Sequence, residues 1–590
     1  MDFYDKQGIK SWSKGIVPSF VTSNAFIGKS YARVIAGYIS DLCRSRSRTN
    51  NGIGIGIIDP MEKLYIVELG SGSGKLAFYV LRELEEIKKR INVNDDGDGD
   101  GDGDVEASLI AMLDQIVYVL TDFTESNIKF WEGHEALLPF VQQGRLDFAR
   151  FEAEKDDCIS LRVSGKVLAK GQVKNPVVVI GNYLIDTLSQ DIFQVENGVL
   201  KEGLVSVHMQ EVASESDREM DDTNGDRTMC SIQNEYKYQK IENQIEEYYK
   251  NRVQPCDELH LARMLEWYQE YFAPGANPSK NHSHKTLDGA SLLIPIGFIK
   301  ALRTLTDLSS GRALIITGDK GASNPNRFRG LTDPHIAYHG SFSVMANFHA
   351  IQLYCINRGG FALMSDQDEV SLMVNAFVLT GDEKESSSSL PPSTSTSLDD
   401  NDIGSSNSKA GYQNLRNAFE DHINSFSPND FYLMQRSMKE EARNPSLFSI
   451  VSLLKLSNWD CELFFKFRDN IISQIPRATI GTKSDFEGGS KKIWNNYYHL
   501  DSVKDVAFEL GRVMFGLHCW EEALEFYQSS VDVCGEHHIT HHNMGLCYSS
   551  LKKYEEAIAC FTKSLELNPD YEKAAIWIEK IKDEKMASID

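Results

Sequence analysis

Cysteine pairs, cationic residues and long apolar runs are all scarce in this sequence of 590 residues, and each shortage excludes a class of protein. The ten cysteines include no CxxC pair, which fits neither a disulfide framework nor a zinc site and is typical of a reducing compartment. Lys and Arg number 61 against 85 Asp and Glu, a formal net charge of −24. That balance argues against a protein whose main partner is nucleic acid, because such proteins neutralise phosphates with Lys and Arg.

Segments for membrane insertion or targeting are not expected either. No stretch approaches the roughly 18 consecutive apolar residues of a membrane span. The first twenty residues contain Asp2 and Asp5, no Arg and no continuous apolar run, so they predict neither a signal peptide nor a mitochondrial transit peptide. The expected location is the cytoplasm.

Three polar segments interrupt the chain. Residues 94–104 (NDDGDGDGDGD) combine like charge with glycine, residues 211–230 are acidic, and residues 383–411 are rich in Ser. Such compositions cannot bury enough apolar surface to fold, so the first is expected to be a disordered insertion and the last a disordered linker. The linker divides the chain into predicted domains at 1–380 and 412–590.

The first predicted domain alternates strands with helices. Short apolar runs predict strands at Tyr65–Leu69, Ile116–Thr121, Leu146–Phe151, Val177–Ile180 and Ala313–Thr317. Strands of this apolar kind, separated by amphipathic helices, predict an α/β domain with a mostly parallel sheet. Between about residues 200 and 300 we expect a helical insertion.

The second predicted domain is helical and ends in an internal repeat. Several residues recur after 34 positions: Leu510, Gly511, Ala523 and Tyr527 correspond to Met544, Gly545, Ala557 and Phe561. This period, with small residues at fixed sites, is the signature of tetratricopeptide repeats. We predict repeats at about 504–537 and 538–571, followed by a capping helix at 572–582.

The segment IVELGSGSGKLA, residues 66–77, places three glycines between a predicted strand and a predicted helix. Glycine lets the backbone approach a ligand closely and adopt conformations that other residues avoid. A phosphate-binding loop requires GxxxxGK followed by Ser or Thr, and here Lys75 is followed by Leu76. A dinucleotide-binding fingerprint requires GxGxxG, and this GxGxG loop is one residue shorter.

An acidic residue two positions before GxGxG is instead the pattern of S-adenosylmethionine-dependent methyltransferases, with Glu68 ahead of Gly70, Gly72 and Gly74. In that pattern the acidic side chain lies where the amino group of the cofactor would bind, and the glycines make room for its amino-acid end. These four residues are therefore predicted to bind S-adenosylmethionine.

Further candidates follow the next predicted strands in chain order. Asp122 ends VYVLTDF, where a carboxylate can accept hydrogen bonds from ribose hydroxyls, and Glu152 provides an acceptor suited to adenine. The fourth strand ends in Asn182, at the edge of the sheet where catalytic groups of open α/β sheets lie. Asn182 could orient a nucleophilic nitrogen, and Asp186 could pair with a cationic substrate. Both are predicted catalytic residues.

No metal site is predicted. The acidic glycine run opens like a calcium loop, but its twelfth position is Ala107 instead of the required Glu. Four histidines between residues 537 and 542 have the spacing of helical zinc ligands, without a carboxylate or cysteine partner in pattern.

Four stretches together resemble the MidA family, the NDUFAF-type mitochondrial complex I assembly methyltransferases and their bacterial relatives. FVTSNAFIGKSYA (20–32) resembles the family's leading segment TSPEIS…FGE, and residues 66–77 resemble its cofactor loop. GNYLIDTLSQDIF (181–193) resembles NEFFDALP, and SVMANFHA (343–350) resembles TAHVDFTA. The resemblance spans about residues 10–380. It implies a Rossmann-like methyltransferase fold, methylation of protein arginine, and the mitochondrion as the alternative location.

The sequence departs from the family pattern at positions that bear on activity. Asn24 and Ala25 stand where the family has Pro and Glu, Tyr183 replaces the Glu of its Asn-Glu pair, and Met345 aligns with its His. Loss of the Glu removes a carboxylate suited to a guanidinium.

Three functional hypotheses stay open. The first is a methyltransferase acting on a protein nitrogen, with the repeats recruiting a partner or substrate protein. The second is an inactive scaffold or assembly factor that keeps the fold. The third is a methyltransferase for a small molecule or RNA, although the net charge of −24 favours no nucleic acid partner.

Overall fold

The computed structural model describes residues 6–14, 16, 20–48, 58–94, 103–212, 229–241, 244–275, 288–338, 342–367, 371–381, 411–440, 442, 444–500 and 504–587. The predicted disordered segments at 94–104 and 383–411 lie almost wholly outside these residues, as does most of the acidic stretch at 211–230. The chain forms two compact units. Unit 1 comprises Met1–Gly8, Tyr31–Ala77 and Leu84–Asn429, and unit 2 comprises Ile9–Ser30, Phe78–Glu83 and Asp430–Asp590.

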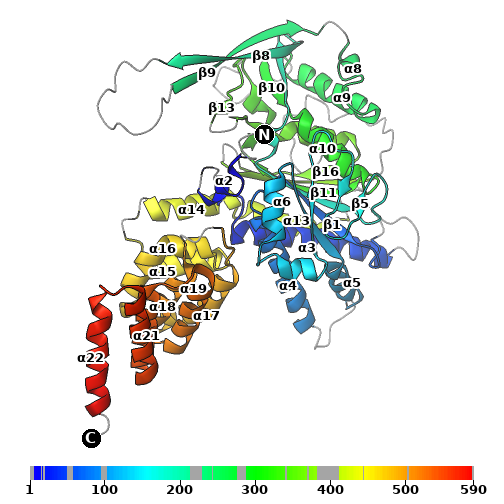
Figure 1. Cartoon of the computed structure of the whole chain (residues 1–590). Helices are drawn as coiled ribbons and strands as arrows, with labels where there is room; N and C mark the ends of the chain where they lie inside the picture. The colour runs from blue at the N-terminus through cyan, green and yellow to red at the C-terminus, as the bar shows by residue number, and fades with distance from the viewer. Residues whose placement is uncertain are drawn as a thin grey trace. The chain divides into compact units, whose positions relative to one another are not determined.

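Unit 1 is built on a seven-stranded sheet with the strand order β16-β17-β11-β6-β1-β2-β3 (Figure 1). The strands are β1 (Leu64–Leu69), β2 (Ile116–Asp122), β3 (Leu146–Arg150), β6 (Val177–Asn182), β11 (Arg312–Asp319), β16 (Phe361–Leu363) and β17 (Met373–Thr380). The first five pair in parallel, and β17 runs antiparallel to both of its neighbours. All five predicted strands are present, and the predicted Rossmann-like fold with a mostly parallel sheet is confirmed.

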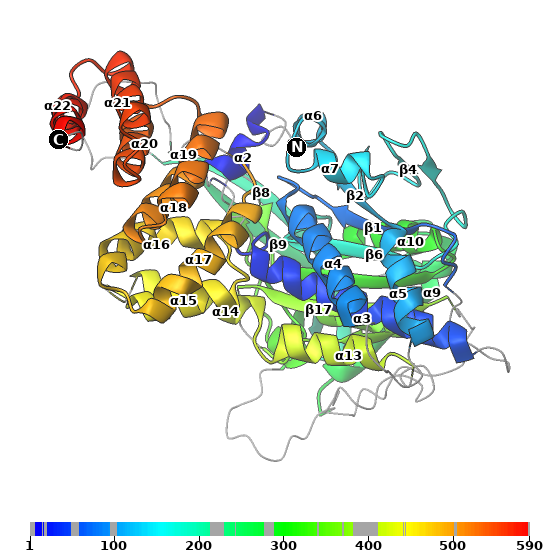
Figure 2. The ribbon, with the colours of Figure 1, turned by 90° about the horizontal axis from the view of Figure 1, so that it is seen from below.

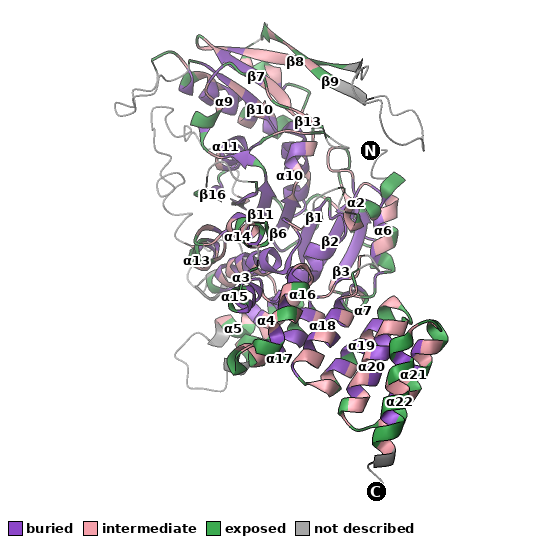
Figure 3. Ribbon diagram, turned by 90° about the vertical axis from the view of Figure 1, so that its left-hand side faces the viewer, coloured by how far each residue is buried: buried purple, intermediate pink, exposed green. Residues whose placement is uncertain are grey.

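Both faces of this sheet are covered, which is why its central strands are apolar along their whole length. Every residue of β1 and β2 is buried, as the purple strands of Figure 3 show. One face is covered by α3 (Ala25–Arg48), α4 (Lys75–Asn94) and α5 (Gly103–Asp114), seen in front of the sheet in Figure 2. The other face packs in one core with α9 (Pro255–Tyr271), α10 (Ile296–Asp307) and α11 (Phe348–Asn357).

The predicted helical insertion between about residues 200 and 300 is wrong over its first part. There β8 (Val199–Val212) and β9 (Met229–Lys240) form a long antiparallel hairpin. With β7 (Asp191–Glu196) and β10 (Ala290–Ile294) they make a second sheet in the order β10-β7-β8-β9. Helices begin only with α8 (Ile245–Tyr248). The sequence pattern that indicates a strand here is an alternation of residues with a period of two, as in Tyr236 and Tyr238. The polar residues around them obscure this alternation.

Unit 2 is helical throughout its described residues, so the predicted all-α region is confirmed. Its helices are α2 (Lys10–Ser13), α14 (Pro428–Glu440), α15 (Leu447–Leu456), α16 (Cys461–Gln474), α17 (Ile480–Asn495), α18 (Val506–Gly516), α19 (Trp520–Cys534), α20 (His538–Ser550), α21 (Tyr554–Leu567) and α22 (Glu572–Ala587).

The last five helices are two helix pairs and a final helix, in the register that the 34-residue period predicts. In the first pair a Cβ at Gly511 would lie 2.6 Å from the Tyr527 ring, and in the second a Cβ at Gly545 would lie 2.8 Å from the Phe561 ring. The absent side chain lets an aromatic ring of the partner helix lie against the backbone. Helix α22 then buries Ala574 against α21, as a cap does.

Packing, and not chain order, decides which segments belong to unit 2. The backbone N–H of Ala25 donates to Asp460 Oδ2 at 2.8 Å, and the Tyr79 hydroxyl donates to the Asn496 carbonyl at 3.2 Å. Residues 411–429, conversely, belong to unit 1. The compact units therefore differ from the predicted boundaries at 380 and 412.

Candidate active site

The glycine loop joins β1 to α4 in a conformation that requires its glycines. Gly70, Gly72 and Gly74 have φ of +60°, +54° and +75°, values at which a side chain is strained. Ser71 ties the loop to β2, because its N–H donates to the Thr121 carbonyl at 3.0 Å and its Oγ accepts from the Thr121 N–H at 3.1 Å. The loop is thus fixed at the point where the order of the strands reverses, between β1 and β6, which is where open α/β sheets bind ligands.

Glu68 lies beside this loop and is almost entirely enclosed, with 6% of its surface exposed. Burial raises the pKa of Glu68 to about 8. The Tyr118 hydroxyl donates a hydrogen bond of 2.9 Å to Oε2, which acts in the opposite direction and lowers the pKa. A buried carboxyl of this kind ionises when a cation binds beside it, because an opposite charge favours the charged form. The predicted role of Glu68 towards an ammonium group is chemically compatible with this environment.

Asp122 ends β2, and its carboxylate is turned towards the start of α6 (Glu125–Glu132). Oδ1 accepts from the N–H and the hydroxyl of Thr124 and Oδ2 from the Asn127 amide, each at 2.9 Å. Burial raises the pKa of Asp122, and the nearby backbone N–H of Gly72 acts in the opposite direction. A carboxylate offers about four acceptor positions, of which these donors fill three. Asp122 could therefore accept one ribose hydroxyl as it stands, and a second only if a donor, most simply the Thr124 hydroxyl, is displaced.

Glu152 follows β3 at the same edge of the sheet. The preceding Phe151 is buried, and its N–H donates to the Asp122 carbonyl at 2.9 Å, so the two strand ends are joined. The Glu152 side chain is 21% exposed and pairs with Lys155 at 2.5 Å. It is accessible to a ligand, as an acceptor for adenine would have to be.

Asn182, at the end of β6, is held by a residue that the sequence did not single out. The Tyr31 hydroxyl, on α3, donates to Asn182 Oδ1 at 2.7 Å. A Cβ at Gly318 would lie 2.9 Å from both of these oxygens, so glycine there makes room for the pair. The Asn182 amide nitrogen is buried and has no hydrogen-bond partner among the described residues. It is a free donor at the edge of the sheet.

Asp186 lies close to a second buried carboxylate, Asp319, which ends β11. The Asp186 N–H donates to Asp319 Oδ2 at 3.2 Å, and Asp319 also accepts from the N–H groups of Ile185 and Lys320. Burial raises the pKa of both carboxyls, that of Asp186 to about 7, and the charge of Asp186 raises that of Asp319 further. Oδ1 of Asp186 has no partner among the described residues. One of the two carboxyls therefore holds a proton at neutral pH.

Three residues of this cluster were not predicted: Tyr31, Tyr118 and Asp319. For Asp319 a signal existed, because it is an acidic residue at the end of an apolar run, as Glu68 and Asp122 are. The two tyrosines carry no such signal, since each contacts its partner only through the tertiary fold.

Tyr118→Phe tests how the buried Glu68 is held. We expect the free energy of unfolding to fall by about 1–3 kcal/mol, because a buried acceptor loses its donor. Urea denaturation measures this, with Tyr65→Phe on the adjacent strand as the control for loss of a core tyrosine hydroxyl. Equal effects of the two substitutions would show that the hydrogen bond to Glu68 contributes nothing.

Among the residues that the structure describes, no group of three or more His, Cys, Asp or Glu is arranged to hold a metal ion. Within the same residues, no helix combines the length and apolar character needed to cross a membrane.

Comparison with known proteins gives one family match. Residues 538–571 match the tetratricopeptide repeat family, in the register of the second predicted copy. No curated protein matches the sequence.

Two solved structures of COG1565 superfamily proteins from Burkholderia thailandensis are similar to the chain. One, bound to S-adenosyl-homocysteine, has 11% identity and a TM-score of 0.31 over 59% of this chain and 76% of that chain. The other, a native structure, has 13% identity and a TM-score of 0.30 over 62% and 82%. At this distance neither bears on activity. The chain thus combines a Rossmann-like α/β unit with a helical region that carries a tetratricopeptide repeat.

Proposed function

We propose that unit 1 is an S-adenosylmethionine-dependent methyltransferase that transfers the methyl group to a nitrogen. The observation that carries the proposal is the loop after β1, where an acidic residue precedes three glycines with positive φ at the point of strand reversal. Its spacing excludes the two common nucleotide loops, and its position is that of a ligand-binding crevice.

The side chains and backbone of the candidate site are chemically suited to bind S-adenosylmethionine. Glu68 is a buried acceptor for its ammonium group, and the positive φ of Gly70, Gly72 and Gly74 gives the loop a turn in which the backbone can approach a ligand closely. Glu152 would accept from adenine. Asp122 already accepts three hydrogen bonds and would accept only one ribose hydroxyl without losing a donor, so its contribution to binding is expected to be smaller than that of the loop.

S-adenosylmethionine supplies an electrophilic methyl group on a cationic sulfonium. The protein's own contribution is to position the nucleophile in a site from which water is excluded. Asn182, fixed by Tyr31, would orient the accepting nitrogen. Asp186, with a free oxygen and a pKa near 7, would bind a cationic acceptor or take its proton. Asp319 is a positioning residue, because its bonds to the backbone of Ile185, Asp186 and Lys320 fix the turn after β6.

The substrate that this site favours is a cationic nitrogen on a protein, with arginine as the form that the MidA resemblance implies. Tyr183 stands where the MidA family has a Glu. The two carboxyls of Asp186 and Asp319 supply negative charge near that position. The tetratricopeptide repeats would recruit the substrate or a partner protein, since stacked helical repeats provide extended binding surfaces.

Calorimetric titration of the full chain with S-adenosylmethionine, S-adenosylhomocysteine and NAD tests the proposal. We expect Kd values on the order of micromolar for the first two, equivalent to about −8 kcal/mol, and no binding of NAD. Binding of NAD alone would show that the short loop is a dinucleotide site. Binding of none of the three by the folded protein would favour the inactive scaffold.

A further inference from the structure

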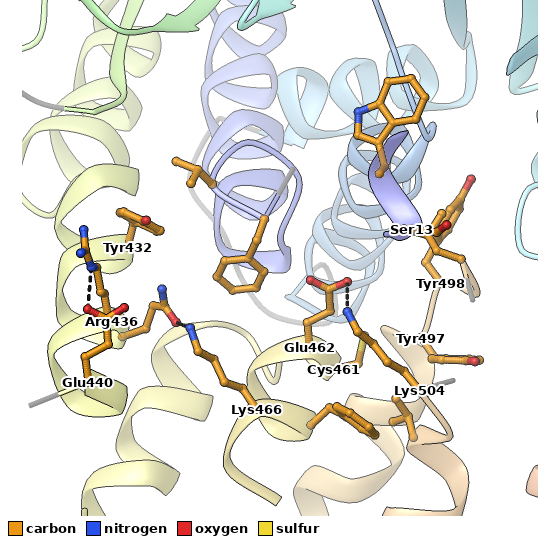
Figure 4. A pocket seen from close by; sticks show the side chains of 17 residues that line it. Ser13, Tyr432, Arg436, Glu440, Cys461, Glu462, Lys466, Tyr497, Tyr498 and Lys504 are labelled. Carbon is orange, nitrogen blue, oxygen red and sulfur yellow. Dashed lines mark hydrogen bonds and ion pairs between the residues drawn. The ribbon is translucent and has the colours of Figure 1, made fainter. Parts of the chain in front are cut away.

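A pocket with a volume of about 320 Å³ lies within unit 2, apart from the candidate active site (Figure 4). It is formed by α2, residues 20–21, α14, α16 and the segment from Tyr497 to the start of α18. Six of its lining residues are aromatic: Trp12, Phe20, Tyr432, Phe465, Tyr497 and Tyr498. Neither the resemblance nor the proposed methyltransferase chemistry assigns a role to this pocket.

The charged residues of the lining are paired, with one exception. Arg436 pairs with Glu440 at 2.8 Å, and Lys504 lies 3.9 Å from Glu462. Lys466 donates at 2.7 Å to Oε1 of Gln435, a neutral and fully buried amide. No carboxylate of the described residues lies within ion-pairing distance of Lys466. Figure 4 shows the Arg436–Glu440 and Lys504–Glu462 pairs as dashed lines.

Lys466 is therefore a half-buried cation that forms no ion pair with a carboxylate of the described residues. Burial lowers the pKa of Lys466. Among the neighbouring charges Glu440 has the largest effect and raises the pKa, Lys439 and Arg436 lower it, and Glu462 raises it least. An ammonium group has three N–H donors, of which Gln435 takes one. A negative group in the pocket would accept the other two and would remove the cost of burying this charge.

The rest of the lining limits what that negative group can be. Two carboxylates, Glu440 and Glu462, line the same pocket, so a doubly charged phosphate would be repelled while a single carboxylate matches the one unpaired cation. The aromatic walls favour an apolar group beside the charge. The pocket also reaches Val506, where the repeat array begins, and such arrays bind extended chains.

We propose that this pocket binds the C-terminal carboxylate of a partner protein, with its last, apolar side chain against the aromatic walls and its carboxylate on Lys466. The pocket is small, since ligand pockets typically have volumes of about 300–1,000 Å³. A chain terminus suits it better than an internal acidic residue, because a terminus leaves the pocket as one segment of chain whereas an internal residue requires room for two. Capture of a terminal carboxylate is an established mode of peptide recognition.

The test is fluorescence polarisation with the full chain and a pool of dye-labelled pentapeptides, Gly-Ser-Gly-Gly-X, where X is Leu, Ile, Phe, Tyr or Trp. We expect the pool with free carboxyl ends to bind at least about tenfold more tightly than the same pool with C-terminal amides. Lys466→Gln should remove that difference, and Lys466→Arg should retain at least part of it. The matched control is Lys455→Gln, since Lys455 lies on α15, pairs with Asp485 and does not line the pocket.

Each alternative occupant has its own outcome. Equal binding of acid and amide pools, or a full difference in Lys466→Gln, would overturn the proposal. Tighter binding of an amidated pool with an internal Glu would assign the pocket to an acidic side chain. Tighter binding of 3-phenylpropionate than of any peptide would assign the pocket to a free small acid. Tighter binding of phenyl phosphate than of any peptide would assign the pocket to a phosphate. Melting curves of all variants exclude loss of fold as the cause.

Discussion

Gly72→Val is expected to weaken binding of S-adenosylmethionine about 100-fold while the protein stays folded. Gly72 has a φ of +54°, where a β-branched side chain is strongly disfavoured, and its carbonyl accepts from Trp131 Nε1 at 3.0 Å. A valine would shift the loop away from this conformation. A loss of about 3 kcal/mol of binding, roughly 100-fold in Kd, would follow, and calorimetric titration measures it.

Gly165→Val is the matched control for backbone strain. Gly165 has a φ of +68° and open space around its Cα, in the turn between β4 (Ile159–Ser160) and β5 (Val167–Leu168). We expect it to lower the melting temperature much as Gly72→Val does and to leave the Kd unchanged. Unchanged affinity in Gly72→Val would show that the glycine loop does not hold the cofactor.

Asp186→Asn is expected to lower kcat by about 100-fold or more while cofactor affinity is retained. The free Oδ1 and the proximity of Asp319 make this carboxyl the group best placed to bind or deprotonate a cationic acceptor. Because its pKa is about 7, the rate of the parent enzyme should rise with pH through about 7 and then level off. The variant should lose this rise. Transfer of labelled methyl to protein in cell extract, followed across pH, measures both effects.

The same substitution should make the protein more stable at high pH. The pKa of Asp186 is raised in the folded state from 3.8 to about 7, so the folded protein binds the proton more tightly than the unfolded chain does. The corresponding stability is present below about pH 4 and is lost as the pH rises through 7. Asp186→Asn removes this dependence, so its melting temperature should exceed that of the parent above pH 7 and match it near pH 4.

A buried carboxylate that is paired with cations provides a control in which an effect on stability can be told from an effect on activity. Asp307, at the end of α10, pairs with Lys170 at 2.8 Å and with Arg303 at 3.5 Å. Asp307→Asn should reduce stability and leave methyl transfer unchanged. If Asp186→Asn retained full activity and the pH profile of the parent, Asp186 would have no part in catalysis.

The local pattern was sufficient to predict the glycine loop and the strands around it. Glycines with positive φ, an acid before them and apolar runs of four to six residues are properties of short segments, and β1, β2, β3, β6 and β11 lie where those runs do. The 34-residue period likewise predicted the two helix pairs, in which Gly511 and Gly545 prove to lie against aromatic rings, because each repeat packs mainly on itself and its neighbour.

Pairs of distant residues could not be predicted in this way. Tyr31 reaches Asn182 across 151 positions, and Asp319 reaches Asp186 across 133. The order of the strands brings these residues together, since β6 lies between β1 and β11 in the sheet although β11 follows it by 130 residues in the chain. The β8–β9 hairpin was missed for a related reason, because its polar strands are defined by pairing with each other and not by an apolar run.

The sequence by itself determined the fold class, the repeat and the kind of cofactor loop, because these depend on conformational preferences and periodicities within a few tens of residues. Only the tertiary structure decided that Asp186 has a carboxyl neighbour, that Asp122 already accepts three hydrogen bonds, and that the described residues provide Lys466 with an amide partner and no ion pair. These are matters of charge and burial. They depend on what the fold places within a few ångströms, from any part of the chain, and on how much water it excludes.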